Sequence, residues 1–218
     1  MAKKIVLVGA FDTKDLVYDF IRKNIEAKGF DVMTINYGIK GSTDLFTVDI
    51  ENTKVAESAG TNLESVLQND DLREQILTMA KGVSRIVAKL HSDGSVAGIF
   101  AVGKAWGTTV ATMAMRTLPI GVPKVMVTTV ASSGIADFVG VKDVNIFPAI
   151  VDVSRVNSIN KYVFTNAAGA IAGMAGVSLP EKLSRKPTIA ITMFGQTKPV
   201  VDYCHSDLEE KGFEPLIF

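Results

Sequence analysis

Three loops of this chain combine glycine with hydroxyl and lysine side chains, which are residue types that can hold a phosphate group. Each loop follows an apolar run that is typical of a buried strand. The candidate residues are Gly9, Asp12, Thr13 and Lys14 in the first loop, Gly103, Lys104, Gly107, Thr108 and Thr109 in the second, and Ser132, Ser133 and Gly134 in the third. Ligands of open parallel sheets bind at the carboxyl ends of the strands, so these loops predict one shared pocket for a phosphorylated ligand.

Within that pocket the residues would have different tasks. Backbone N–H groups and the Lys14 ammonium group would hold phosphates, while the hydroxyl of Thr108 or Ser132 would meet a metal-bound oxygen. A lysine in the first turn of a helix opposes the helix dipole. Lys14 is therefore better explained by a ligand than by helix stability.

The same loops also fit purely structural roles. Asp12 and Thr13 are residue types that cap helices, and residues 103–109 fit a tight strand-to-helix turn capped by Thr108. The second loop has neither the Walker A order nor the Gly-x-Gly-x-x-Gly fingerprint. Small and hydroxyl residues like those of the third loop are common in ordinary turns. Both interpretations stay open at this level.

Other kinds of catalytic site have less support. The second predicted strand ends at Asn36 and Tyr37, where nicotinamide enzymes commonly carry an acidic residue for the ribose. His91 and His205 are far apart, and no His/Cys cluster has the spacing of metal ligands. Cys204 has only its neighbour His205 as a possible base, and neighbours on a helix point in different directions. No metal held by side chains is expected.

Composition narrows the class of partner. The 218 residues have a formal net charge of zero and no block of like charges, so nothing in the bulk charge favours nucleic acid or anionic lipid. The apolar runs are far shorter than the roughly 18 residues of a membrane span. A single cysteine allows no internal disulfide, and the first residues lead into a strand pattern. We expect a cytoplasmic protein whose partner is a small molecule or another protein.

Apolar runs alternate with helical patterns along most of the chain, and this alternation is typical of a parallel sheet covered on both faces. Strands are expected at residues 5–8, 31–37, 96–102, 124–129 and 144–147. Helices are expected after Asp12 up to Gly29, over residues 55–90 as one helix or two, and at residues 108–115 and 156–175. The fold class is therefore α/β, Rossmann-like, with a mostly parallel sheet.

The end of the chain repeats its beginning. An apolar run, a Thr-Lys turn and a helix that ends in Lys-Gly-Phe occur at residues 4–30 and again at residues 187–213. The repeat predicts a domain at residues 1–180, a linker at 181–186, and at 187–218 the first β-α-β of a second, similar domain. An incomplete β-α-β leaves an open strand edge, so we expect a homo-oligomer or the missing C-terminal half to cover it.

Several segments resemble one known family, the Tm-one-like ATP-binding family, which includes the N-terminal region of a tomato protein that inhibits tobamovirus RNA replication. The segments are residues 9–14, 118–127, 139–140, 151–153, 166–168 and 191–195. The resemblance extends over essentially the whole chain and implies two Rossmann-like domains in tandem. It also implies that the domain binds ATP. The hydroxyl groups of the loops add Mg²⁺ as a candidate companion ion.

One loop departs from the family pattern. Relatives usually have Gly-Gly-Ser-Gly-Gly-Thr where this chain has Gly103-Lys104-Ala105-Trp106-Gly107-Thr108. The exchange removes backbone freedom and adds bulk where a phosphate would approach, which weakens the expectation of ATP. The Lys104 charge would offset part of this loss. Trp106 would narrow the site, stack on a base or fill a hydrophobic gap.

Three functional hypotheses follow. The first is a nucleotide-binding module, part of a larger protein or complex. The second is an enzyme that acts on a small carboxylate or phosphorylated metabolite, with Asp12 or Asp152 as the acid-base group. The third is a non-catalytic module for assembly or interaction, which depends on the open β-α-β at residues 187–218.

Overall fold

The computed structural model describes residues 3–132, 134–177 and 186–218. Two compact units divide the chain, residues 1–177 and residues 178–218. The predicted linker at residues 181–186 falls outside the described residues except for Lys186, as does the predicted site residue Ser133.

The first unit is built on a five-stranded sheet in which every neighbouring pair of strands is parallel. The strands are β1 (Lys4–Gly9), β2 (Val32–Asn36), β3 (Val96–Gly103), β4 (Lys124–Thr128) and β5 (Asn145–Pro148), in the spatial order β2-β1-β3-β4-β5. This arrangement confirms the predicted α/β, Rossmann-like fold.

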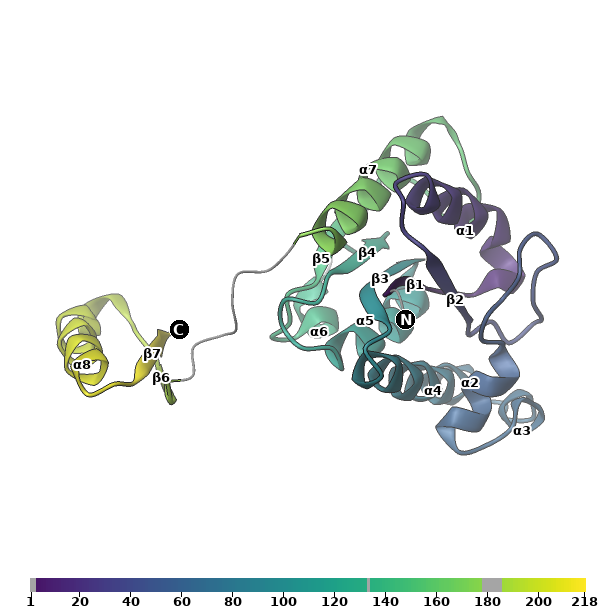
Figure 1. The fold of residues 1–218 in the computed structure, drawn as a ribbon. Helices are drawn as coiled ribbons and strands as arrows, with labels where there is room; N and C mark the ends of the chain where they lie inside the picture. The colour runs from purple at the N-terminus through teal and green to yellow at the C-terminus, as the bar shows by residue number, and fades with distance from the viewer. Residues whose placement is uncertain (1–2, 133, 178–185) are drawn as a thin grey trace. The chain divides into compact units, whose positions relative to one another are not determined.

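Helices cover both faces of this sheet, as Figure 1 shows. On one face lie α1 (Phe11–Glu26) and α7 (Ser158–Ala175); on the other lie α2 (Asn52–Ala59), α3 (Leu63–Leu67), α4 (Leu72–Ser92) and α5 (Ala105–Arg116), and the short α6 (Ile135–Val139) contacts α5. Successive side chains of β1 alternate between the two cores: Ile5 packs with α1 and α7, and Val6 packs with α4 and α5. No helix of the described residues is long and apolar enough to span a membrane.

The predicted helical region at residues 55–90 contains three helices rather than one or two. Helix α2 stops at Gly60, whose φ of 94° lies in the left-handed region that glycine adopts without steric cost. The side chains of Asn62 and Asp71 then accept hydrogen bonds from the first turns of α3 and α4. These local stop and start signals outweigh the continuous apolar spacing.

Tyr18 of α1 joins β1 to β3 at the carboxyl end of the sheet. Its buried hydroxyl donates toward the carbonyls of Val8 and Val102, at 2.7 and 3.0 Å, and accepts from the N–H of Val102 at 2.9 Å. A Cβ on Gly9 would lie 2.4 to 2.5 Å from the rings of Phe11 and Tyr18. Gly9 is therefore required by the packing of these aromatic rings.

The second unit, described from Lys186 onward, has the predicted β-α-β order. Strands β6 (Thr188–Ile191) and β7 (Glu214–Ile217) are parallel, and η1 (Gly195–Thr197) and α8 (Lys198–Glu210) connect them. Cys204 lies on α8, as the sequence indicates.

Candidate functional site

The order of the strands locates a crevice. From β1 the chain goes to β2 on one side of the sheet and then to β3 on the other, so the connections diverge between β1 and β3. In parallel sheets of this order, ligands bind outside the carboxyl ends of the strands at such a switch point. The first two predicted loops flank this position.

A pocket of about 400 Å³ lies there, and we call it the switch-point pocket. Its polar side contains residues of the loops after β1, β2 and β3, and its apolar side contains residues of α4 and α5. The lining residues are Ala10, Asp12, Thr13, Lys14, Tyr37, Gly38, Ile39, Lys40, Leu72, Ile76, Met79, Lys104, Ala105, Trp106, Gly107 and Val110.

Three lysines from three different segments line the switch-point pocket: Lys14 in the first turn of α1, Lys40 after β2, and Lys104 after β3. Burial lowers the pKa of Lys14, and the positive charge of Lys104 lowers it further, although Asp12 and Asp152 oppose this shift. Lys14 also has a non-helical backbone (φ −138°, ψ 25°) inside the first turn of α1. The partly buried lysines therefore repel one another and lose hydration, and an anionic ligand would reduce both unfavourable contributions.

Asp12 connects α1 to the loop after β2 instead of capping the helix. The N-cap of α1 is Ala10, which receives no side-chain bond, so the predicted capping by Asp12 and Thr13 is wrong. Asp12 Oδ2 accepts the N–H of Lys40 at 2.8 Å, and its carboxyl group packs against Gly38. The other oxygen, Oδ1, is buried without a hydrogen-bond partner in the described part of the chain. Such an oxygen can accept a hydrogen bond from a ligand.

Tyr37 forms part of the same wall. Burial, and then the negative charge of Asp12, raise the pKa of Tyr37 well above its ordinary value, so the phenol stays protonated. A Cβ on Gly107 would lie 3.1 Å from the Tyr37 hydroxyl. Gly107 therefore makes room for this phenol at the start of α5.

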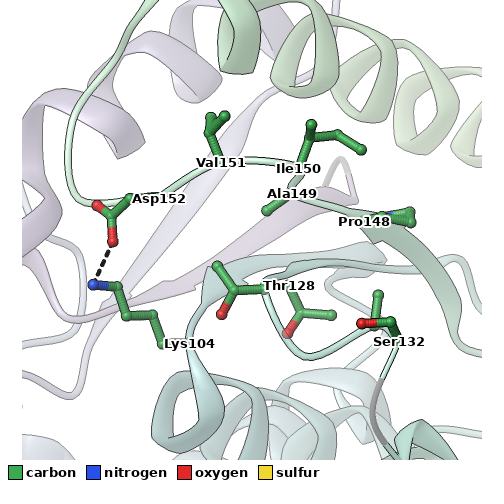
Figure 2. A pocket seen from close by; sticks show the side chains of 10 residues that line it. Lys104, Thr128, Ser132, Pro148, Ala149, Ile150, Val151 and Asp152 are labelled. Atoms are coloured by element: carbon green, nitrogen blue, oxygen red, sulfur yellow. Dashed lines mark ion pairs between the residues drawn. The ribbon is translucent and has the colours of Figure 1, made fainter.

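A second pocket, of about 700 Å³, lies at the same edge of the sheet, and we call it the β4–β5 pocket (Figure 2). The loops after β4 and β5 supply most of its wall, and Lys104 stands at one end. The lining residues are Lys104, Thr128, Thr129, Ala131, Ser132, Pro148, Ala149, Ile150, Val151 and Asp152.

Lys104 lines both pockets and forms an ion pair with Asp152. Figure 2 shows the two side chains directed toward each other from the loops after β3 and β5. The hydrogen bond from Lys104, and then those from Ser154, lower the pKa of Asp152 to about 2. Both side chains are more than half exposed, so the pair contributes little to stability.

The backbone after β5 is strained at Ile150. This residue has a φ of 64°, the only positive φ of a non-glycine residue among the described residues. The N–H of Val151 donates to the carbonyl of Ala149 at 2.6 Å, which closes a γ-turn around Ile150. A β-branched residue rarely adopts this conformation, and such outliers concentrate at functional sites.

The remaining predicted site residues are divided between packing and the pockets. A Cβ on Gly103 would lie 2.8 Å from the backbone of Gly107, so Gly103 allows α5 to start close to β3. Thr108 is not a cap, because Lys104 is the N-cap of α5; its buried hydroxyl bonds the Lys104 carbonyl and, at 2.7 Å, the Thr128 hydroxyl. Neither Thr108 nor Thr109 lines a pocket described above.

The third loop contributes to a different pocket from the first two. Ser132 lines the β4–β5 pocket, whereas Gly134, with a φ of 67°, is the N-cap of α6 and lines neither pocket. The single pocket expected from three loops is thus two pockets that share Lys104. Among the described residues, no group of three or more His, Cys, Asp or Glu side chains could hold a metal ion.

Sequence reasoning missed several lining residues. Tyr37 and Lys40 follow β2, and residues 149–151 follow β5, whose last residue Pro148 also lines a pocket. The rule that sites form at the carboxyl ends of parallel strands applied to all of them. What singled out the other loops was their glycine and lysine content. The apolar wall from α4, which includes Ile76 and Met79, had no signal distinct from ordinary core spacing.

Comparison with known proteins identifies the family of this domain. The model of the uncharacterised protein family UPF0261, N-terminal domain, matches residues 3–180. A UPF0261 protein of Clostridium tetani is 36% identical over 218 residues, which cover all of this chain and 54% of that protein. The UPF0261 protein mlr3387 of Mesorhizobium japonicum is 35% identical over 91% of this chain and 49% of its own length.

A plant protein is also similar. The ToMV resistance protein Tm-1(GCR237) of Solanum lycopersicum is 28% identical over 99% of this chain and 31% of its own length. The chain spans about half the length of the bacterial relatives named above. From the match over residues 3–180 and the similarity to these proteins, we conclude that the chain belongs to the uncharacterised protein family UPF0261 and contains its N-terminal domain.

Proposed function

We propose that this domain binds a nucleotide, with ATP as the leading candidate, in the switch-point pocket. The observation that carries the proposal is the convergence of Lys14, Lys40 and Lys104 on a pocket whose opposite side is apolar. A nucleotide likewise has a charged part and an apolar part, because its phosphates are anionic and its base has a flat face that stacks on apolar and aromatic side chains.

The apolar side of the pocket suits a base. Ile76 and Met79 of α4 face the pocket together with Trp106 and Val110 of α5. Trp106 is 45% exposed, so part of its ring is available for stacking. The volume of about 400 Å³ is within the range of small-molecule pockets.

Polar groups that could orient the ligand are also present. Asp12 Oδ1 has no hydrogen-bond partner among the described residues and could accept from a ribose hydroxyl. The protonated Tyr37 phenol could donate to a ligand oxygen. In this chain, lysine charge would take the place of the glycine-rich loop of the family as the main means of holding phosphates.

Fluorescence of Trp106 offers a direct test, because it is the only tryptophan of the chain and lines the pocket. Titration with ATP, with and without Mg²⁺, should change the emission in a saturable way. Lys40→Met should weaken binding about tenfold, the loss expected for one charge-assisted hydrogen bond. Lys89→Met, an exposed substitution on α4, is the matched control and should bind normally.

Two outcomes would refute nucleotide binding here. One is the absence of any fluorescence change and of any heat in calorimetry at millimolar ATP. The other is equal binding by the Lys40→Met variant and the wild type, which would place the ligand elsewhere.

The enzyme hypothesis gains no comparable observation. Asp152 has a pKa of about 2, so it is ionised at neutral pH and cannot act as a general acid there. Asp12 is held by the N–H of Lys40. The assembly hypothesis stays a prediction.

A further inference from the structure

We propose that the β4–β5 pocket is a second binding site and that it takes a small anion, a carboxylate or a phosphate ester. It is separate from the switch-point pocket and shares only Lys104 with it. The proposal does not rest on nucleotide binding in the switch-point pocket, although the two ligands would share Lys104.

Hydrogen-bond donors without an acceptor surround this pocket. The hydroxyl groups of Thr129 and Ser132 make no hydrogen bond to any described residue, and neither do the backbone N–H groups of Ala131, Ser132, Ile150 and Asp152. Thr128 differs, because its hydroxyl already bonds Thr108 and the N–H of Val130. Carbonyl oxygens of the same loops, such as those of Thr129, Ala131 and Ile150, also accept no hydrogen bond from a described residue, so the preference for an anion comes from these donors acting together with the Lys104 ammonium group.

The strained turn shapes the side of the pocket that faces these donors. Figure 2 shows the side chains of Ile150 and Val151 on the side of their loop that points away from Thr128 and Ser132. Ile150 is 74% exposed as a residue, so burial does not explain its positive φ. The turn instead places the backbone of residues 149–152 along the pocket, where the N–H groups of Ile150 and Asp152 are the two donors of this segment that bond no described residue.

The positive charge at the end of the pocket belongs to Lys104, which is already paired with a carboxylate. Lys104 supplies the cation, and the carboxylate of Asp152 now holds it. A ligand anion would compete with Asp152 for the same ammonium group. Removal of the Asp152 charge should therefore strengthen anion binding, whereas removal of Lys104 should weaken it.

The test uses inorganic phosphate and acetate as probes and follows backbone amide resonances of the chain by NMR. We expect at least one probe to shift the amides of Ala131, Ser132, Ile150 and Asp152 in a saturable way. Asp152→Asn should strengthen this binding several-fold, and Ser132→Ala should weaken it several-fold. Ser92→Ala, an exposed change at the opposite end of the sheet, is the matched control.

Saturation by phosphate alone would identify a phosphate ester as the ligand class, and saturation by acetate alone a carboxylate. The proposal is overturned if neither probe saturates these amides at up to tens of millimolar. It is also overturned if the shifts are confined to Gly38 and Lys40 in the switch-point pocket, or if Asp152→Asn does not strengthen binding.

Discussion

Lys104 and Asp152 form an ion pair across the carboxyl edge of the sheet, although β4 separates the strands that precede them. Lys104 is the N-cap residue of α5, and Asp152 follows the strained turn after β5. The pair stands where the switch-point pocket and the β4–β5 pocket meet. The pair therefore contributes little to stability, and under both binding proposals Lys104 is the residue that the two ligands would share.

Replacement of Lys104 by Met should raise the pKa of Asp152 from about 2 toward its ordinary value of 3.8. The rise should be incomplete because the hydrogen bonds from Ser154 remain. The free energy of unfolding should change by less than about 1 kcal/mol, since both partners are exposed. NMR titration of the carboxyl resonance checks the pKa, and an unchanged value would show that the ion pair does not form in solution.

Removal of the Tyr18 hydroxyl should be strongly destabilising. Tyr18→Phe would leave the N–H of Val102 and two carbonyls without this partner in the core, at a cost of about 2 to 4 kcal/mol. Urea unfolding measures the loss, and Tyr162→Phe on the exposed side of α7 is the control, with a change near zero. A loss equal to that of the control would mean that water replaces the phenol.

Relief of the strain at Ile150 should stabilise the domain. Ile150→Asn places a residue that tolerates positive φ at an exposed position, so we expect a gain of about 1 kcal/mol. Chemical denaturation checks the sign. If the variant is less stable than the wild type, the positive φ does not represent strain.

A methyl group on Gly9 should disrupt the core beneath the switch point. Gly9→Ala would place a Cβ 2.4 to 2.5 Å from the rings of Phe11 and Tyr18, and we expect a loss of at least about 2 kcal/mol. Gly173→Ala on α7 is the contrasting control, because nothing lies within 4 Å of the added atom and alanine favours the helix. Equal effects of the two changes in urea unfolding would contradict this packing role.

The lowered pKa of Lys14 predicts a pH dependence with a defined sign. A lysine whose folded pKa lies below that of the unfolded chain destabilises the fold while it is charged, so its contribution improves as pH rises from the folded value toward 10.5. Lys14→Met should therefore raise stability at neutral pH, by an amount that solvent screening keeps small. The gain in stability should diminish above pH 10. The Lys14→Met variant should also bind anions more weakly than the wild type. A loss of stability at pH 7 in this variant would contradict the prediction.

Much of the fold could be predicted from the sequence because its signals are local. Alternating apolar runs and helical spacing indicated the strands and the repeat of β-α-β at the chain end, and the parallel order followed from their alternation. Helix ends were less predictable. Asp12, Thr13 and Thr108 are residue types that commonly cap helices, but the N-cap positions of α1 and α5 are occupied by Ala10 and Lys104.

The sequence by itself determined that the loops after β1, β3 and β4 carry candidate ligand-binding residues, because the end of a parallel strand can be recognised from the apolar run before it. Only the tertiary structure decided how those residues are grouped. The strand order places Lys14, Lys40 and Lys104 around the switch-point pocket. The loop after β5 brings Asp152 to Lys104 at the β4–β5 pocket. These residues are far apart in the sequence. Their proximity depends on the order and twist of the strands, which local sequence patterns do not encode.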